Sequence, residues 1–114
     1  MSLAKRIAAS RQSNRKSFDV AEWGEDGVPL TVYVGMLTCA DVDRLQRKHQ
    51  NFMSNPTVAA MVDLIIMKAE DKDGEKLFTL EDKPILMRES VAIISKIAGE
   101  MFSSVEKQED LGND

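Results

Sequence analysis

Two stretches near the front of the chain have the look of β-strands, and the second alternates between apolar and polar residues, the pattern of a half-buried strand. They span residues 17–23 and 28–34, and the connection 24–27 holds two glycines and an aspartate, which supply the positive φ angles of a tight turn. The sequence therefore predicts an antiparallel hairpin. Because Pro29 has no backbone donor, its strand is expected at an edge, or to bond through its other positions. The alternating apolar positions of this strand are Val28, Leu30, Val32 and Val34.

After the hairpin the apolar spacing changes to three and four residues, which indicates helices. Thr38 is expected to cap the first helix, with Asp41 in its first turn, and this helix is expected to continue to Asn55. A second helix is predicted over 56–70, with its proline in the first turn. It is apolar over more than half its circumference, so it is expected to be central or engaged with another molecule. The two stripes are Val42, Leu45, His49, Phe52 and Met53, then Val58, Met61, Val62, Ile65 and Ala69.

The second half of the chain is predicted to be helical after one turn. Residues 71–74 have turn composition, 76–78 form a brief extended piece, and Thr79 is expected to cap a short helix over 80–89. A last helix is predicted over 89–105. The fold class is therefore α+β and mainly helical, an N-terminal β-hairpin followed by three to four helices. The stripe of the last helix is Val91, Ile94, Ile97, Ala98, Met101, Phe102 and Val105.

The 114 residues suggest one domain, and the 43% hydrophobic and 30% charged content excludes global disorder. Residues 1–16 are predicted to be a basic flexible arm and 17–105 a single globular domain. Residues 106–114, with four acids and no aromatic, are predicted to be an acidic disordered tail. Within the arm a short helix is expected to be lined by Leu3, Ile7 and Ala8.

The formal net charge of −4 conceals an asymmetry along the chain. The first 16 residues carry five basic groups and no acid, so the other 98 carry 10 basic and 19 acidic groups. An acidic body repels nucleic-acid phosphates, and a solvated tail is the favoured interpretation of the arm. The alternative function is a small regulatory or adaptor protein whose arm contacts nucleic acid. The basic groups of the arm are Lys5, Arg6, Arg11, Arg15 and Lys16.

The residues that build most catalytic and metal sites are scarce. Cys39 and His49 are the only residues of their kinds, and on one helix they would lie about 15 Å apart, too far for a dyad. They are also too few for a structural zinc site. A calcium loop with Gly74 at its sixth position would need oxygen donors at Ala69 and Leu80. The sequence therefore predicts no enzymatic activity, no cofactor and no metal.

The single cysteine excludes an internal disulfide and suits a reducing cytoplasm. No run of about 18 apolar residues occurs, so no membrane span is expected. The basic N-terminus lacks the apolar segment of a secretory signal.

What remains is apolar surface. Six methionines follow Met1, and methionine is frequent on surfaces that accept varied partners, although such a stripe more often forms core. Apolar helices in so small a domain are expected to leave part of their stripes exposed as an interaction site. Partner contacts are predicted on the second and last helices. The predicted contact residues are Met61, Leu64, Ile65, Met67, Ile97, Met101 and Phe102.

One stretch carries a family resemblance. Residues 69–82 read Ala-Glu-Asp-Lys-Asp-Gly-Glu-Lys-Leu-Phe-Thr-Leu-Glu-Asp, an acidic turn, a glycine, Leu-Phe-Thr and an acidic pair between two helices. Before it, a hairpin containing Trp23 precedes a helix with Thr38 and Asp41 at its start. In this order, residues 17–105 resemble the tail assembly chaperones of long-tailed bacteriophages.

The resemblance implies a non-enzymatic protein of the host bacterial cytoplasm that is absent from the finished virion. Such chaperones bind the coiled-coil-prone tape measure protein and keep it soluble until tail tube subunits polymerise around it. In many phages a frameshifted longer form is thought to recruit the major tail tube protein. The apolar segment 56–70 also favours a homo-oligomer, although a monomer agrees with the sequence too.

Overall fold

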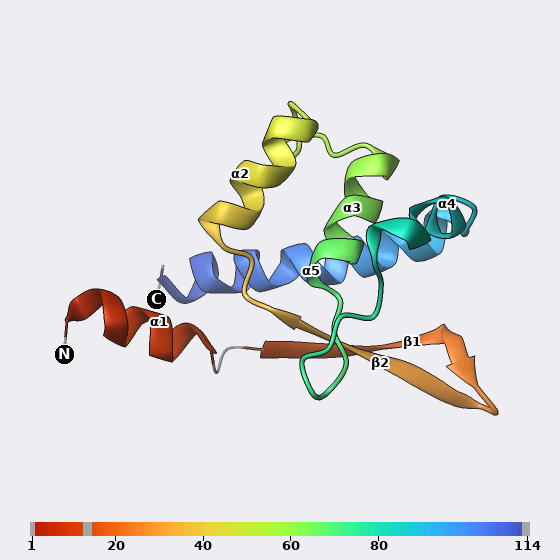
Figure 1. The fold of residues 1–114 in the computed structure, drawn as a ribbon, viewed down its shortest axis with the longest axis horizontal. Helices are drawn as coiled ribbons and strands as arrows, with labels where there is room; N and C mark the ends of the chain where they lie inside the picture. The colour runs from red at the N-terminus through yellow and green to blue at the C-terminus, as the bar shows by residue number, and fades with distance from the viewer. Residues whose placement is uncertain (1, 13–14, 113–114) are drawn as a thin grey trace.

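The computed structural model describes residues 2–12 and 15–112, with side-chain surroundings for 2–9 and 15–103. A two-stranded hairpin lies beneath a group of helices, and one helix precedes it (Figure 1). The predicted α+β, mainly helical class is confirmed. The elements are α1 (Leu3–Gln12), β1 (Arg15–Glu25), β2 (Val28–Gly35), α2 (Cys39–Lys48), α3 (Val58–Lys68), the 3-10 helix η1 (Leu80–Asp82), α4 (Lys83–Leu86) and α5 (Val91–Gly112).

The predicted hairpin is confirmed. Its strands pair antiparallel, and Asp26 and Gly27 turn the chain with φ angles of 53° and 79°. Alternation works as expected in the middle of the hairpin, where Val20, Val32 and Val34 are buried under the helices. β1 begins two residues before the predicted strand, so the end of the predicted arm belongs to the sheet.

A bulge near the end of β1 redirects the only tryptophan. The register of the two strands shifts there, and a Cβ on Gly24 would lie 2.0 Å from the carbonyl oxygen of Val28, so only glycine fits. Trp23 Nε1 donates to Glu89 Oε2 at 2.8 Å. The Trp23 ring also meets Phe78 edge to face, with centroids 5.6 Å apart. The bulge therefore ties the hairpin to the segment before η1 and to the start of α5.

The start of α2 is as predicted, but its end is not. The Thr38 hydroxyl accepts a hydrogen bond from the Asp41 amide at 3.1 Å, and the Asp41 carboxylate accepts one from the Thr38 amide at 3.0 Å. The helix ends at Lys48 instead of continuing to residue 55. His49 leaves the helical conformation, and the chain folds back so that Phe52 is fully buried. Tertiary burial of this phenylalanine outweighs continuation of the helix.

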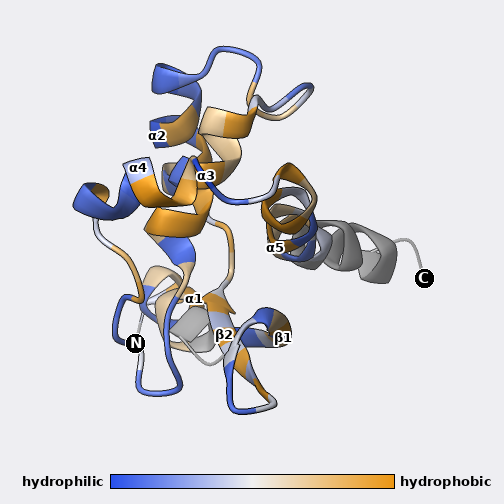
Figure 2. Cartoon of the chain, turned by 90° about the vertical axis from the view of Figure 1, so that its right-hand side faces the viewer, coloured by the Kyte–Doolittle hydropathy of each residue, from blue (hydrophilic) through white to orange (hydrophobic). Residues whose placement is uncertain are grey.

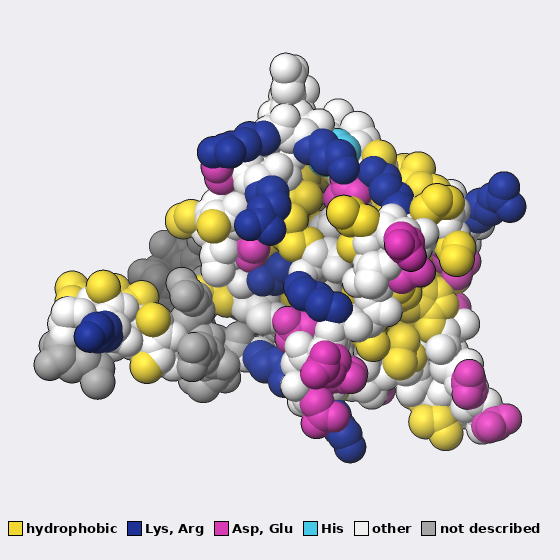
Figure 3. All heavy atoms as spheres, in the orientation of Figure 1, with side chains coloured by type: hydrophobic (Ala, Val, Ile, Leu, Met, Phe, Trp, Pro, Cys, Tyr) yellow, Lys and Arg dark blue, Asp and Glu magenta, His cyan; other side chains and the backbone are white. Residues whose placement is uncertain are grey.

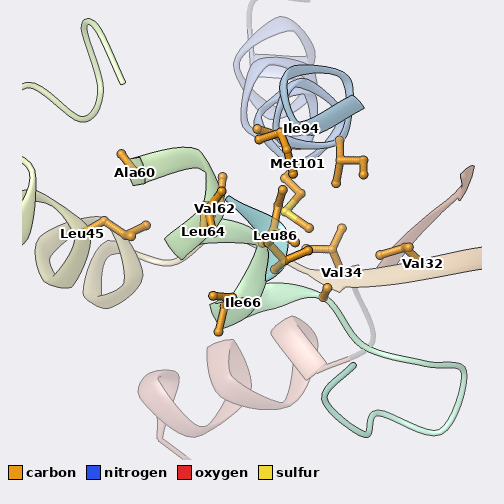
Figure 4. Packing of buried hydrophobic residues seen from close by; sticks show 14 of the residues in the cluster. Val32, Val34, Leu45, Ala60, Val62, Leu64, Ile66, Leu86, Ile94 and Met101 are labelled. Atoms are coloured by element: carbon orange, nitrogen blue, oxygen red, sulfur yellow. The ribbon is translucent and has the colours of Figure 1, made fainter. Parts of the chain in front are cut away.

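The apolar helix α3 is central, one of the two predicted placements. It begins at Val58 with Thr57 as its cap, so Pro56 precedes the helix instead of opening it. Figure 2 shows it hydrophobic over most of its length. Its residues pack against α5 on one side and α2 on the other (Figure 4). Most of its apolar residues are thus covered within one chain, and the homo-oligomer stays a prediction. The fully buried positions are Ala60, Val62, Leu64 and Ile65.

The segment after α3 forms the predicted turn. Gly74 has a φ of 85°, and the Asp71 carboxylate accepts hydrogen bonds from the amides of Asp73 and Glu75. The extended piece beside it pairs Glu70 with both Tyr33 and Lys76. The turn is therefore held to the hairpin.

The last two predicted helices differ in length from the prediction. The segment 80–89 is a 3-10 turn followed by α4, which ends at Leu86, because Pro84 starts a new helical turn. Ser90 caps α5, and the helix passes the predicted end at residue 105 to reach Gly112. The part of the predicted tail up to that glycine is helical, since it contains good helix formers and no breaker. Residues 113–114 lie outside the described residues.

The predicted short helix near the N-terminus is confirmed as α1, which lies to one side of the body in Figure 1. Leu3 and Ile7 remain more than half exposed, and Ala8 is half-buried. Of the stretch 10–17, residues 13–14 lie outside the described residues.

Candidate partner-binding site

The predicted contact residues divide into two groups. Four are core residues and present no surface to a partner in this conformation, because α3 and α5 turn these positions toward each other. The prediction of contacts at these four is therefore corrected. They are Leu64, Ile65, Ile97 and Met101. The other three are partly buried and pack against the core: Met61, Met67 and Phe102.

The exposed apolar surface lies elsewhere, on η1, α4 and the start of α5. Leu80 is 72% exposed and Ile85 70%, while Val91 is 59% and Met87 44% exposed. We call these four residues the η1–α4 apolar surface. Of these four residues the predicted helical stripes include only Val91, because η1 and α4 are too short to complete the helical periods that reveal an amphipathic helix.

A pocket of about 450 Å³ lies next to this surface, between α2, α3 and residues 76–80. Its size is that of ordinary ligand pockets. We call it the α2–α3 groove. Its apolar lining combines two buried side chains, two partly buried ones and one exposed one: Leu45 and Ile66, Met67 and Phe78, and Leu80. Of the predicted contact residues, only Met67 lines it.

The aromatic wall of the groove depends on the hairpin. Phe78 lines the groove and rests edge to face on Trp23, which the bulge in β1 aims toward it. The sequence carried one signal for this residue, the Leu-Phe-Thr segment. That signal places an aromatic residue beside a turn but does not show which surface the residue lines.

A buried carboxylate forms the polar end of the groove. Asp63 of α3 is only 7% exposed, and its Oδ2 lies 2.7 Å from His49 Nε2 and 3.4 Å from Lys48 Nζ. Its Oδ1 lies 3.0 Å from Lys83 Nζ as an ion pair, without an aligned hydrogen bond. Burial alone raises the pKa of Asp63, but the hydrogen bond from His49 and the ion pair with Lys83 outweigh it. The pKa of Asp63 is therefore below its ordinary value of 3.8.

This cluster is structural in character. The Asp63 carboxylate is ionised at neutral pH and forms ion pairs with Lys48 and Lys83, so it is a poor general base. It instead joins the end of α2 and the start of α4 to the centre of α3, because its three partners come from these places. Sequence reasoning missed Asp63. Its only signal was an acidic residue within an otherwise apolar helix.

Two basic residues of the predicted arm are held by the body. Arg15 donates to the Asp71 carbonyl at 2.7 Å, lies 3.5 Å from the Glu70 carboxylate and stacks over the Tyr33 ring. Lys16 contacts Glu100 of α5, with Nζ 2.9 Å from its carbonyl and 3.3 Å from its carboxylate. These cations serve to fasten β1 to its neighbours.

The candidate nucleophile and metal residues are not brought together. Cys39 is exposed in the first turn of α2, and His49 closes the other end of that helix. Across residues 2–12 and 15–112, no group of three or more His, Cys, Asp or Glu side chains has metal-binding geometry. In the same part of the chain, no helix combines the length and hydrophobicity that crossing a membrane requires.

Comparison of the chain with protein-family models, with curated proteins and with solved structures gives no match in any of the three.

Proposed function

We propose that this protein is a bacteriophage tail assembly chaperone, which binds the tape measure protein in the host bacterial cytoplasm and is absent from the finished virion. The observation that supports this most directly is the α2–α3 groove beside the η1–α4 apolar surface. Together they offer an apolar site on a chain that is otherwise rich in charge. Exposed apolar side chains gathered beside an apolar groove are typical of protein-binding sites.

The mechanism follows from the chemistry of the two partners. A tape measure protein displays apolar helical stripes that would associate with one another before the tail tube covers them. The groove and the adjoining surface would cover such a stripe by helix-in-groove contacts, and Met67 and Met87 would adapt to different side chains. Many copies along one long chain would make a modest affinity sufficient. A longer frameshifted form would bring the major tail tube protein to the same complex.

The alternative, a regulator whose basic arm contacts nucleic acid, has less support. Arg15 and Lys16 form ion pairs with Glu70 and Glu100, so they neutralise charges of the body and add little to a phosphate-binding patch.

The test is co-expression with the tape measure protein encoded in the same phage or prophage genome. The wild-type chain should raise the soluble yield of that protein and co-purify with it. The triple variant Leu80→Ser/Ile85→Ser/Met87→Ser should lose most of this effect, because it removes the exposed apolar contact area without touching the core. Circular dichroism should show that the variant is folded.

The matched control is Leu3→Ser/Ile7→Ser, which removes two apolar side chains of α1 that are also more than half exposed. This control should behave as wild type. If the wild-type chain neither raises the soluble yield nor co-purifies, the proposed function is wrong. If both variants lose the effect equally, the η1–α4 apolar surface is not the contact.

A further inference from the structure

The α2–α3 groove has a charge opposite to that of the chain as a whole. Arg44, Lys48 and Lys76 line it against the single carboxylate of Asp63, whereas the whole chain has a net charge of −4. Figure 3 shows Lys and Arg side chains gathered around hydrophobic ones on this face. A local positive field on an acidic protein is a specific feature, because overall composition would produce the reverse.

Two of the three cations of the groove, Arg44 and Lys76, are not paired with a carboxylate among the described residues, whereas Lys48 is paired with Asp63. Among the described residues Arg44 has no ion-pair partner, and Lys76 contacts only the backbone carbonyl of Met67. By contrast, Arg47 of α2 and Lys68 of α3, which do not line the groove, each pair with a carboxylate of α2. Unpaired, exposed cations at the rim of an apolar groove can bind carboxylates of a partner without first breaking an internal ion pair.

The carboxylate inside the groove does not reverse this preference. Asp63 is only 7% exposed and is engaged by His49, Lys48 and Lys83, so its charge is compensated from within. The surface that a partner meets is therefore an apolar lining with positive edges. The lining is open at one side, where Leu80 is 72% exposed, which suits a side chain presented by another polypeptide.

From this charge complementarity we propose that the groove binds an acidic amphipathic helix of a partner polypeptide. One or two apolar side chains of that helix would enter between Ile66, Met67 and Phe78, and its flanking Glu or Asp residues would meet Arg44 and Lys76. A helix is the fitting form because helices α2 and α3 form most of the groove and leave no free sheet edge to extend. The inference rests on the proposed function only in that the chain binds a polypeptide. It identifies the acidic part of that partner as the segment the groove selects.

The experiment uses the full chain and synthetic fluorescent peptides of about 18 residues, five helical turns. One peptide has leucines at helical spacing flanked by glutamates, and its matched partner has lysines in place of the glutamates. Fluorescence anisotropy should give an affinity about tenfold higher for the glutamate peptide at low salt. This ratio should shrink toward one at about 0.5 M salt, because the rim charges are exposed and screened.

Two variants separate the rim from general charge effects. Arg44→Glu/Lys76→Glu should lower the affinity for the glutamate peptide about tenfold or more and raise it for the lysine peptide. The control Lys5→Glu/Lys72→Glu makes the same change of net charge at exposed positions outside the groove, and it should leave both affinities nearly unchanged. Leu80→Ser, at an exposed position, should weaken the binding of both peptides while the protein stays folded.

Equal binding of the two peptides at low salt would overturn the proposal, and so would equal effects of the two charge-reversal variants. Binding of free decanoate with no binding of either peptide would also overturn it and indicate a site for small anionic amphiphiles. None of these outcomes depends on the co-expression test. A chain that binds the glutamate peptide but does not solubilise a tape measure protein would retain this inference and lose the proposed function.

Discussion

Replacement of Asp63 by asparagine tests the idea that one buried carboxylate joins three helices. The variant keeps the shape of the side chain and removes its charge, which leaves His49, Lys48 and Lys83 facing each other without a counter-charge. A hydrogen bond to a charged group contributes about 1.5–3 kcal/mol. Because Lys48 is 58% exposed and Lys83 28%, both can turn toward water, so we expect a loss of about 2 kcal/mol.

The assay is thermal unfolding followed by circular dichroism at neutral pH. A loss of about 2 kcal/mol corresponds to a fall in Tm of about 8 °C for a domain of this size. The matched control is Asp43→Asn, which removes an exposed carboxylate that pairs with Arg47 one helical turn away on α2. Such surface pairs contribute about 0.3–0.5 kcal/mol, so the control should shift Tm by about 2 °C or less.

The pH dependence provides a second, independent readout. The pKa of Asp63 is lower in the folded protein than its ordinary value of 3.8, so the ionised carboxylate stabilises the fold above that value. This stabilisation is lost as the pH falls through the folded-state pKa. The difference between wild type and Asp63→Asn should therefore be largest near neutral pH and shrink below about pH 3.8. A variant no less stable than the Asp43 control, or a difference that does not change with pH, would refute the reasoning.

Two further changes test packing by urea unfolding. Gly24→Ala should lower the free energy of unfolding by about 1–3 kcal/mol, because its Cβ would lie 2.0 Å from the Val28 carbonyl oxygen. The control Gly99→Ala lies inside α5, where a Cβ meets nothing within 4 Å, and should raise the free energy of unfolding by about 0.5–1 kcal/mol. Equal effects of the two variants would contradict the close approach at Gly24. Phe52→Ala should cost about 3–5 kcal/mol because this ring is fully buried, and Met53→Ala beside it, half exposed, should cost about 0.5 kcal/mol or less. A small loss for Phe52 would mean that the chain after α2 does not fold back as described.

Features that depend on neighbouring residues were predictable from the sequence. The hairpin turn at Asp26 and Gly27 is determined by the φ angles that these residues accept, and the capping box at Thr38 is determined by side chains three residues apart. The apolar composition of residues 56–70 predicted a helix that is either central or engaged with another molecule, and the first alternative holds for α3, because so wide an apolar face must be covered on several sides. These signals also determined the fold class.

Features that depend on distant residues were decided only by the tertiary structure. The end of α2 is determined by the burial of Phe52. Which apolar side chains stay exposed is determined by the faces that α3 and α5 bury against each other. Asp63 acquires its role only because His49 and Lys83, far from each other in the sequence, meet it in space. Periodicity shows that a helical face is apolar but not which partner covers it. Most of the predicted contact residues therefore lie in the core, and the groove is formed by α2, α3 and residues 76–80.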